Sequence, residues 1–207
     1  MNKKKLTLII GATIIILMVT LTIIYEKNKE EDTPIQNEKE EIKKIDEIID
    51  FDYYLEEDAT TYYKELYDEL KNIIGSEEID YKEYSNKVSQ LFVTDLFSLD
   101  NKISSNDIGG LQFIYPGFKE DFIKIAQTTL YSSVESNIYG DRNQELPIVT
   151  KVNIVSTNES TFNYNDTTYE SYEVNLEIDY EKDLSYPKNY KVTLIKNDKY
   201  IQVVSSE

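Results

Sequence analysis

A single acidic residue interrupts an apolar helix face and is the first candidate for chemistry. Asp95 lies near the centre of a stripe formed by Val88, Leu91, Phe92, Leu96 and Leu99. A carboxylate there must be hydrogen-bonded, paired or protonated. It would act as a general base if it faced a cavity where Tyr172 or Tyr180 donated hydrogen bonds. Alternatively, the helix is rotated away, or Asp95 is a structural acid that binds a tyrosine hydroxyl or loop amides; we predict the structural role.

A second candidate is the oxygen-bearing run from Asp141 to Glu145. Calcium-binding loops place ligands at alternate positions in this way, with glycine at position six and glutamate at position twelve. Leu146 and Val152 occupy those two positions here. We therefore predict an exposed turn and no metal site.

The absence of two reactive residue types excludes several enzyme classes. The chain has no histidine and no cysteine, so a Ser-His-Asp triad, a Cys-His pair, a common zinc site and a disulfide framework are all impossible. The sequence also has no glycine-rich phosphate loop, and we expect no cofactor. We predict that the protein is not an enzyme; the alternative is a pocket enzyme or small-molecule binder that uses Asp and Tyr.

The N-terminal segment Leu6–Tyr25 has twenty uncharged residues, twelve of them Ile, Leu or Val. Such a helix reaches about 30 Å, the thickness of the bilayer core. No small-x-small cleavage site follows it, and Lys3, Lys4 and Lys5 precede it, which favours a cytoplasmic N-terminus. We expect a cytoplasmic tail (1–5), a retained single-pass anchor in the cell membrane (6–25), a stalk (26–38) and an extracytoplasmic domain (39–207).

The part after the predicted anchor is strongly acidic, with 39 acidic against 19 basic residues. Such a field repels nucleic-acid phosphates, so we expect no nucleic-acid partner. The acidic residues either form a solvated surface that keeps the domain soluble, or they give it a preference for cations or basic partners. Heavy use of Ile, Lys, Asn and Tyr is typical of an AT-rich bacterial genome.

Helical periodicity organises the first half of the domain. A narrow stripe of Ile42, Ile45, Ile49 and Tyr53 predicts a helix from Glu40, which either packs on its own domain or forms an interface for self-association or a partner. A second stripe from Ala59 to Ile74 predicts a helix that ends at Gly75. The residues Asp80-Tyr81-Lys82-Glu83 form a capping box for the helix that carries Asp95. Pro116 is expected to open another helix, with a face of Phe118, Phe122, Ile125, Ala126, Thr129 and Val134.

The second half changes to a period of two. From Tyr172 to Glu181, apolar and polar residues alternate strictly, which predicts a strand with one buried face. Further strands are expected over 148–157, 190–196 and 199–205, with a tight turn at Asn197-Asp198. The sequence therefore predicts an α+β fold with helices packed on a curved antiparallel sheet of about four strands.

The stretches LFVTDLFSL and GGLQFIYPGF, followed by the strands from Ile148, resemble the nuclear transport factor two-like, or cystatin-like, cone over Thr60 to Ser206. This resemblance lies in the order of elements, and it assigns no catalytic residue here. It implies a fold that serves enzymes such as ketosteroid isomerase, empty pockets, and membrane-anchored components of Gram-positive envelope or conjugation machines. The anchored components match best, so we expect a non-catalytic assembly protein whose partner is an envelope protein or a second copy.

Overall fold

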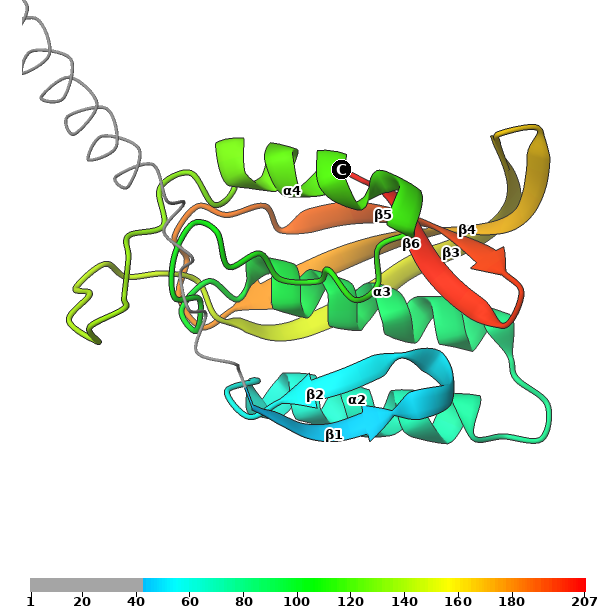
Figure 1. Ribbon diagram of the computed structural model, residues 1–207, viewed down its shortest axis with the longest axis horizontal. Helices are drawn as coiled ribbons and strands as arrows, with labels where there is room; N and C mark the ends of the chain where they lie inside the picture. The colour runs from blue at the N-terminus through cyan, green and yellow to red at the C-terminus, as the bar shows by residue number, and fades with distance from the viewer. Residues whose placement is uncertain (1–42) are drawn as a thin grey trace, which may run out of the picture. The chain divides into compact units, whose positions relative to one another are not determined.

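The computed structural model describes residues 43–207, which form an α+β domain (Figure 1). Three α-helices pack on a curved antiparallel sheet, as the sequence predicts. The predicted tail, anchor and stalk, and the interface candidate Ile42, lie outside the described residues. Among residues 43–207, no helix is both long and apolar enough to cross a bilayer.

The described chain begins with a small β-hairpin, continues with helices and ends with long strands. Its elements are β1 (Lys44–Ile48), η1 (Ile49–Phe51), β2 (Tyr53–Glu56), α2 (Thr61–Ile74), α3 (Tyr81–Phe97), η2 (Pro116–Phe118), α4 (Lys119–Thr128), β3 (Val149–Tyr164), β4 (Thr167–Tyr180), β5 (Asn189–Asn197) and β6 (Tyr200–Ser206).

The four late strands form one sheet in the order β3-β4-β5-β6, with every neighbouring pair antiparallel. The alternation in β4 is confirmed, because Tyr172, Val174, Leu176 and Ile178 are all buried. The strands β3 and β4 are longer than predicted and meet in a two-residue turn at Asn165-Asp166, where both residues have positive φ. Positive φ at both central residues suits a tight hairpin, because it matches the strand twist.

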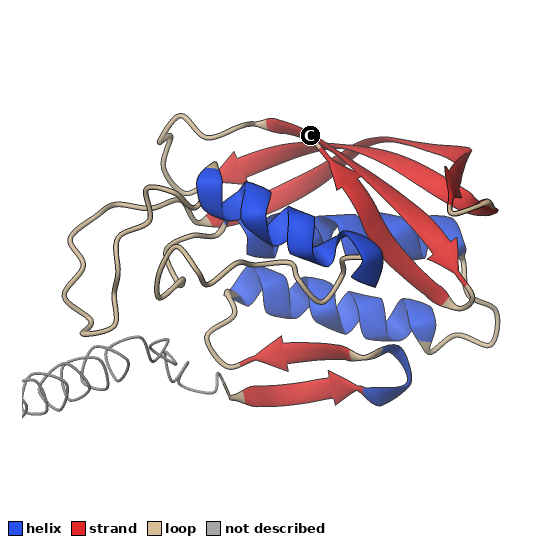
Figure 2. Cartoon of the chain, turned by 45° about the horizontal axis from the view of Figure 1, so that its top comes forward, coloured by secondary structure: helices blue, strands red, loops and turns tan. Residues whose placement is uncertain are grey.

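The domain is layered, with the β1–β2 hairpin on α2, α2 on α3, and α3 on the sheet (Figure 2). The buried faces of α2 and α3 agree with the predicted stripes, and Asp80 caps α3 by accepting hydrogen bonds from the Lys82 and Glu83 amides. Helix α4 lies beside α3, where the rings of Phe122 and Phe92 are 5.7 Å apart. The core therefore lies between the helices and the concave face of the sheet.

The far end of the β3–β4 hairpin has a separate aromatic cluster. Phe162, Tyr164 and Tyr169 on the hairpin contact Tyr115 and Phe118, with ring centroids 4.8 to 6.4 Å apart. Edge-on and tilted pairs at these distances are favourable arrangements of aromatic rings. The cluster joins the long hairpin to the segment that leads into α4.

The predicted helix from Glu40 is wrong, because its described residues form the β1–β2 hairpin. The spacing of Ile45, Ile49 and Tyr53 fits a helix, but the same stretch also alternates, and Tyr53 and Leu55 are both buried in β2. Asp52 has a φ of 56°, which turns the chain back. As a result, Ile45 and Ile49 are exposed by 46% and 80%, whereas Tyr53 is buried and cannot belong to the predicted interface.

The helix predicted after Pro116 exists, but its face is only partly correct. A short 3-10 turn begins at Pro116, and α4 ends at Thr128, so Val134 lies beyond the helix. Ala126 is buried, whereas Ile125 is 62% exposed. The periodic pattern could not show that the helix stops early.

We predict different effects on stability for substitutions at a buried and at an exposed residue of the hairpin. The Tyr53 hydroxyl lies 2.6 Å from the Tyr84 hydroxyl and donates to the Ile201 carbonyl, so Tyr53→Phe should lower the free energy of unfolding by about 1–3 kcal/mol. Ile49→Ser should change it by less than about 0.5 kcal/mol, because Ile49 is exposed. Urea unfolding measures both; equal losses would contradict the hairpin.

Candidate functional site

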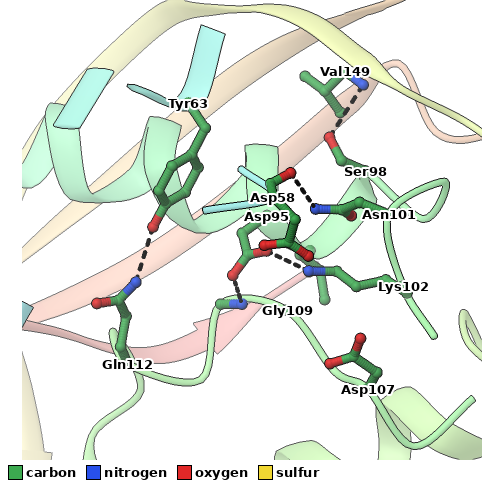
Figure 3. Close-up of polar contacts among 12 residues, drawn as sticks. Asp58, Tyr63, Asp95, Ser98, Asn101, Lys102, Asp107, Gly109, Gln112 and Val149 are labelled. Atoms are coloured by element: carbon green, nitrogen blue, oxygen red, sulfur yellow. Dashed lines mark hydrogen bonds and ion pairs between the residues drawn. The ribbon is translucent and has the colours of Figure 1, made fainter. Parts of the chain in front are cut away.

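The carboxylate of Asp95 has a partner for each of its oxygens (Figure 3). The Lys102 ammonium lies 2.6 Å from Oδ1, and the Gly110 backbone N–H donates to Oδ2 over 2.6 Å. The side chains of Lys102 and Asp95 are 6% and 22% exposed, respectively. Asp95 therefore ties the end of α3 to the connecting segment, which we define as residues 98–115.

Two glycines allow the connecting segment to approach α3 this closely. A Cβ on Gly109 would lie 2.1 Å from the backbone oxygen of Asp95, which no side chain can tolerate. Gly110 has a φ of 77°, and a Cβ there would lie 2.6 Å from the ring of Phe92. The pair Gly109-Gly110 is thus what places a backbone amide on the carboxylate.

The charges around Lys102 keep its ammonium protonated. Burial lowers the pKa of Lys102, but the carboxylate of Asp95, with Tyr131 and Asp107, raises it, and the net shift is upward. Figure 3 shows the side chains of Asp58, Asp95 and Asp107 around the lysine. A lysine with a raised pKa is a poor base or nucleophile, since both roles require the neutral amine. Its role here is to neutralise acidic groups.

The hydroxyl of Tyr131 completes the arrangement. It accepts a hydrogen bond from the Gly109 amide over 3.0 Å and donates one to the Leu96 carbonyl over 2.8 Å. Burial raises the pKa of Tyr131, so the phenol stays neutral. The hydroxyl thus acts as both acceptor and donor, and it holds the connecting segment against α3.

The arrangement considered for general-base chemistry does not form. Among the described residues, the hydrogen-bond partners of Asp95 include neither Tyr172 nor Tyr180. The Tyr180 hydroxyl instead donates to the Pro187 carbonyl over 2.8 Å. Asp95 therefore makes the kind of contacts expected of a structural acid, with a loop amide and a cation.

The run from Asp141 to Glu145 lies in the loop before β3, and its basic member holds the loop in place. The Arg142 guanidinium donates to three backbone carbonyls, those of Asp100, Lys102 and Glu135. Glu145 pairs with Lys182 on the surface. No group of three acidic, histidine or cysteine side chains suited to a metal occurs within residues 43–207.

An apolar groove of about 250 Å³ lies between α4 and the β6 edge of the sheet. Its walls include Phe118, Phe122 and Ile125 from the α4 side, and Val203 and Ser205 from β6. Asp95 is not among the lining residues, so the acid and the groove are separate features.

Comparison with protein-family models, curated proteins and solved structures finds no match to this chain. The site must therefore be interpreted from its own geometry.

Sequence reasoning found Asp95 but missed most of its partners. Lys102 stands in a polar loop, where a lysine normally faces solvent, and Tyr131 lies beyond the end of α4. The pair Gly109-Gly110 was the available signal, because adjacent glycines often mark a close backbone approach. Gln112, which joins the connecting segment to β2 by exchanging hydrogen bonds with the Tyr54 backbone, carried no signal.

We predict that Gly109→Ala will destabilise the domain severely, by several kcal/mol, because the new Cβ would overlap the Asp95 backbone. Gly140→Ala is the matched control. Gly140 has a φ of 70° but no atom within 4 Å of its Cβ position, so only the backbone strain of about 1–2 kcal/mol remains. Thermal unfolding of both variants separates steric overlap from loss of glycine flexibility, and similar midpoints would contradict the close approach.

We also predict that Asp95→Asn will lower the free energy of unfolding by about 3–5 kcal/mol, because the buried Lys102 cation loses the carboxylate that is ion-paired with it. The double variant Asp95→Asn with Lys102→Met should lose less than Asp95→Asn alone, since no unpaired charge remains. Denaturant unfolding of the single and double variants tests the coupling. Additive losses would show that the two side chains act independently.

Proposed function

We propose that this protein is a non-catalytic assembly protein of a bacterial cell envelope, anchored by residues 6–25 with residues 39–207 outside the membrane. The anchor is inferred from twenty uncharged residues preceded by three lysines. The observation that carries the proposal is that Asp95, the acid within the apolar face, has its carboxylate occupied by Lys102 and the Gly110 amide. The residue considered as a general base therefore uses its carboxylate in structural contacts.

The β1–β2 hairpin supports docking through its exposed side. Ile45 in β1 and Ile49 in the 3-10 turn that joins the two strands are exposed, so they contribute little to the core. Apolar side chains held on a rigid element are effective anchors in interfaces, because little conformational entropy is lost on binding. Proteins anchored in the same membrane also meet at a high effective concentration, so modest contacts suffice for them to associate.

The resemblance to the cone fold contributes to the proposal as an analogy of architecture. The structure has a curved four-stranded sheet over helices, and the anchored envelope components named by the resemblance have the same predicted order of tail, span and external domain. Fold similarity alone is a weak guide to function, so the proposal depends mainly on the exposed hairpin and the engaged acid.

A second candidate function is small-molecule binding, and the groove between α4 and β6 favours it. The groove is mostly apolar, and the residues that line it include a few polar ones, among them Asp121 and Ser205. Ligand pockets commonly combine these features. Nile red, a neutral apolar dye, is a suitable probe; saturable fluorescence with one site per chain, lost in Ile125→Asp, would favour this alternative.

Chemical crosslinking of the full-length chain in intact cells tests the assembly function. We expect the wild type to give a defined higher-mass species that is lost in Ile45→Asp/Ile49→Asp. Val155→Asp is the control, because Val155 is 63% exposed but lies on β3, which belongs to the four-stranded sheet and not to the hairpin. No crosslinked species in the wild type, or equal loss in the control, would overturn the proposed docking face.

A further inference from the structure

The loop before β3 presents two neighbouring apolar residues to solvent. Ile138 is 62% exposed and Tyr139 is 89% exposed. This loop (yellow-green in Figure 1) projects at the end of the domain opposite the β3–β4 turn. Such large apolar side chains contribute little to the fold when exposed, and clustered ones commonly mark an interaction site.

The loop is held rigidly by its own polar residues. Arg142 binds the carbonyls of Asp100, Lys102 and Glu135, and the Asn137 amide donates to the Ile103 carbonyl over 2.7 Å. The Gln144 side chain accepts from the Glu135 amide and donates to the Ser133 carbonyl. These contacts hold both sides of the tip, so Ile138 and Tyr139 are presented in a fixed conformation.

The same chain carries an apolar cavity that suits this tip. The groove between α4 and β6 has a volume of about 250 Å³ and apolar walls that include Phe118 and Phe122. Ser205 and Asp121, which also line it, could accept a hydrogen bond from a tyrosine hydroxyl. A buried tyrosine needs such a partner for its polar end.

Charge also favours contact between these two surfaces. Residues 43–207 include 32 acidic and 16 basic residues, so most faces of two copies repel each other. By contrast, α4 has two lysines, one glutamate and one aspartate, β6 has no charged residue, and residues 136–140 are uncharged. The tip and the groove are therefore the surfaces where two copies can meet at low electrostatic cost.

We propose that the Ile138-Tyr139 tip of one copy inserts into the α4–β6 groove of a second copy. Tip and groove are different surfaces, so the contact is head-to-tail and each copy retains a free tip and a free groove. Such contacts form rings or open chains. This inference names a second copy as one partner of the proposed assembly protein and rests on that function, although it uses a surface other than the β1–β2 hairpin.

A membrane surface is a less favourable binding partner for the tip. Two apolar side chains supply little insertion energy, and the flanking Glu135 and Asp141 would face the headgroups of the bilayer. The net negative charge of the domain adds repulsion from anionic lipids. In the groove of a second copy, by contrast, the apolar side chains of the tip would be covered by apolar walls.

Disulfide trapping in intact cells tests the contact, because the natural chain has no cysteine. The full-length chain with Asp141→Cys and Ser205→Cys places one thiol beside the tip and one at the groove. Mild oxidation should give a ladder of multimers, whereas either single-cysteine chain alone should stay monomeric. Co-expressing the two single-cysteine chains should give a dimer only.

Substitutions in the tip and groove make the test specific. Adding Tyr139→Asp or Ile125→Asp to the two-cysteine chain should abolish the ladder, and Val155→Asp should leave it unchanged. Co-expression of a Tyr139→Asp chain carrying Ser205→Cys with an Ile125→Asp chain carrying Asp141→Cys should restore a dimer, because one intact tip meets one intact groove. Ile125 and Tyr139 are exposed, so neither change should unfold the domain.

Several results would overturn the inference. They are the absence of a ladder, a ladder that survives both substitutions, and trapping of Asp141→Cys to a different protein. Loss of the ladder with Ile45→Asp/Ile49→Asp would also contradict it, since that hairpin is a different surface. If the ladder is absent but the hairpin-dependent crosslink persists, this inference fails while the proposed function stands.

Discussion

The ion pair between Lys102 and Asp95 is the interaction that fixes the connecting segment, and the loops at that end of the domain depend on it. Asp95 holds Gly110 through its amide, and Lys102 brings its own backbone carbonyl within reach of Arg142. Because Arg142 in turn fixes the loop before β3, one carboxylate in α3 indirectly positions a loop some forty residues away in sequence. The position of the exposed tip therefore depends in part on the buried pair, in addition to the hydrogen bonds within the loop.

A buried ion pair is an expensive way to join two segments, since both charges lose much of their hydration. An apolar pair could fill the same volume, but it could not bind a backbone amide and select one register for the glycines. In this protein the two features occur together, because the space that Gly109 leaves open is occupied by the Asp95 backbone. We infer that the pair provides conformational specificity at this position, with net stability a smaller benefit.

The sequence predicted the elements whose patterns are long, and it failed where the pattern was short. The buried face of β4 and the stripes of α2 and α3 extend over many residues, so a single period dominates them. From Ile45 to Tyr53 only three apolar residues defined a helix, and the turn at Asp52 decided against it. Lys102 could not be predicted as the partner of Asp95, because that pairing depends on how the connecting segment returns to α3 rather than on any local periodicity.

The distribution of polar and apolar groups supports the proposed role in binding over a catalytic one. The side chains of Asp95 and Tyr131 could in principle act as a base and an acid, but both are already hydrogen-bonded. Asp95 is paired with Lys102, and Tyr131 accepts a hydrogen bond from the Gly109 amide. Two of the exposed apolar residues, Ile49 and Tyr139, lie far apart in the sequence, on a hairpin and on a loop that are both held by hydrogen bonds. Binding through such residues loses little conformational entropy, because their backbone is already ordered. A fold that uses its buried charges to fix its loops is therefore well suited to contacts between protein surfaces, where the shape of the exposed side chains determines the partner.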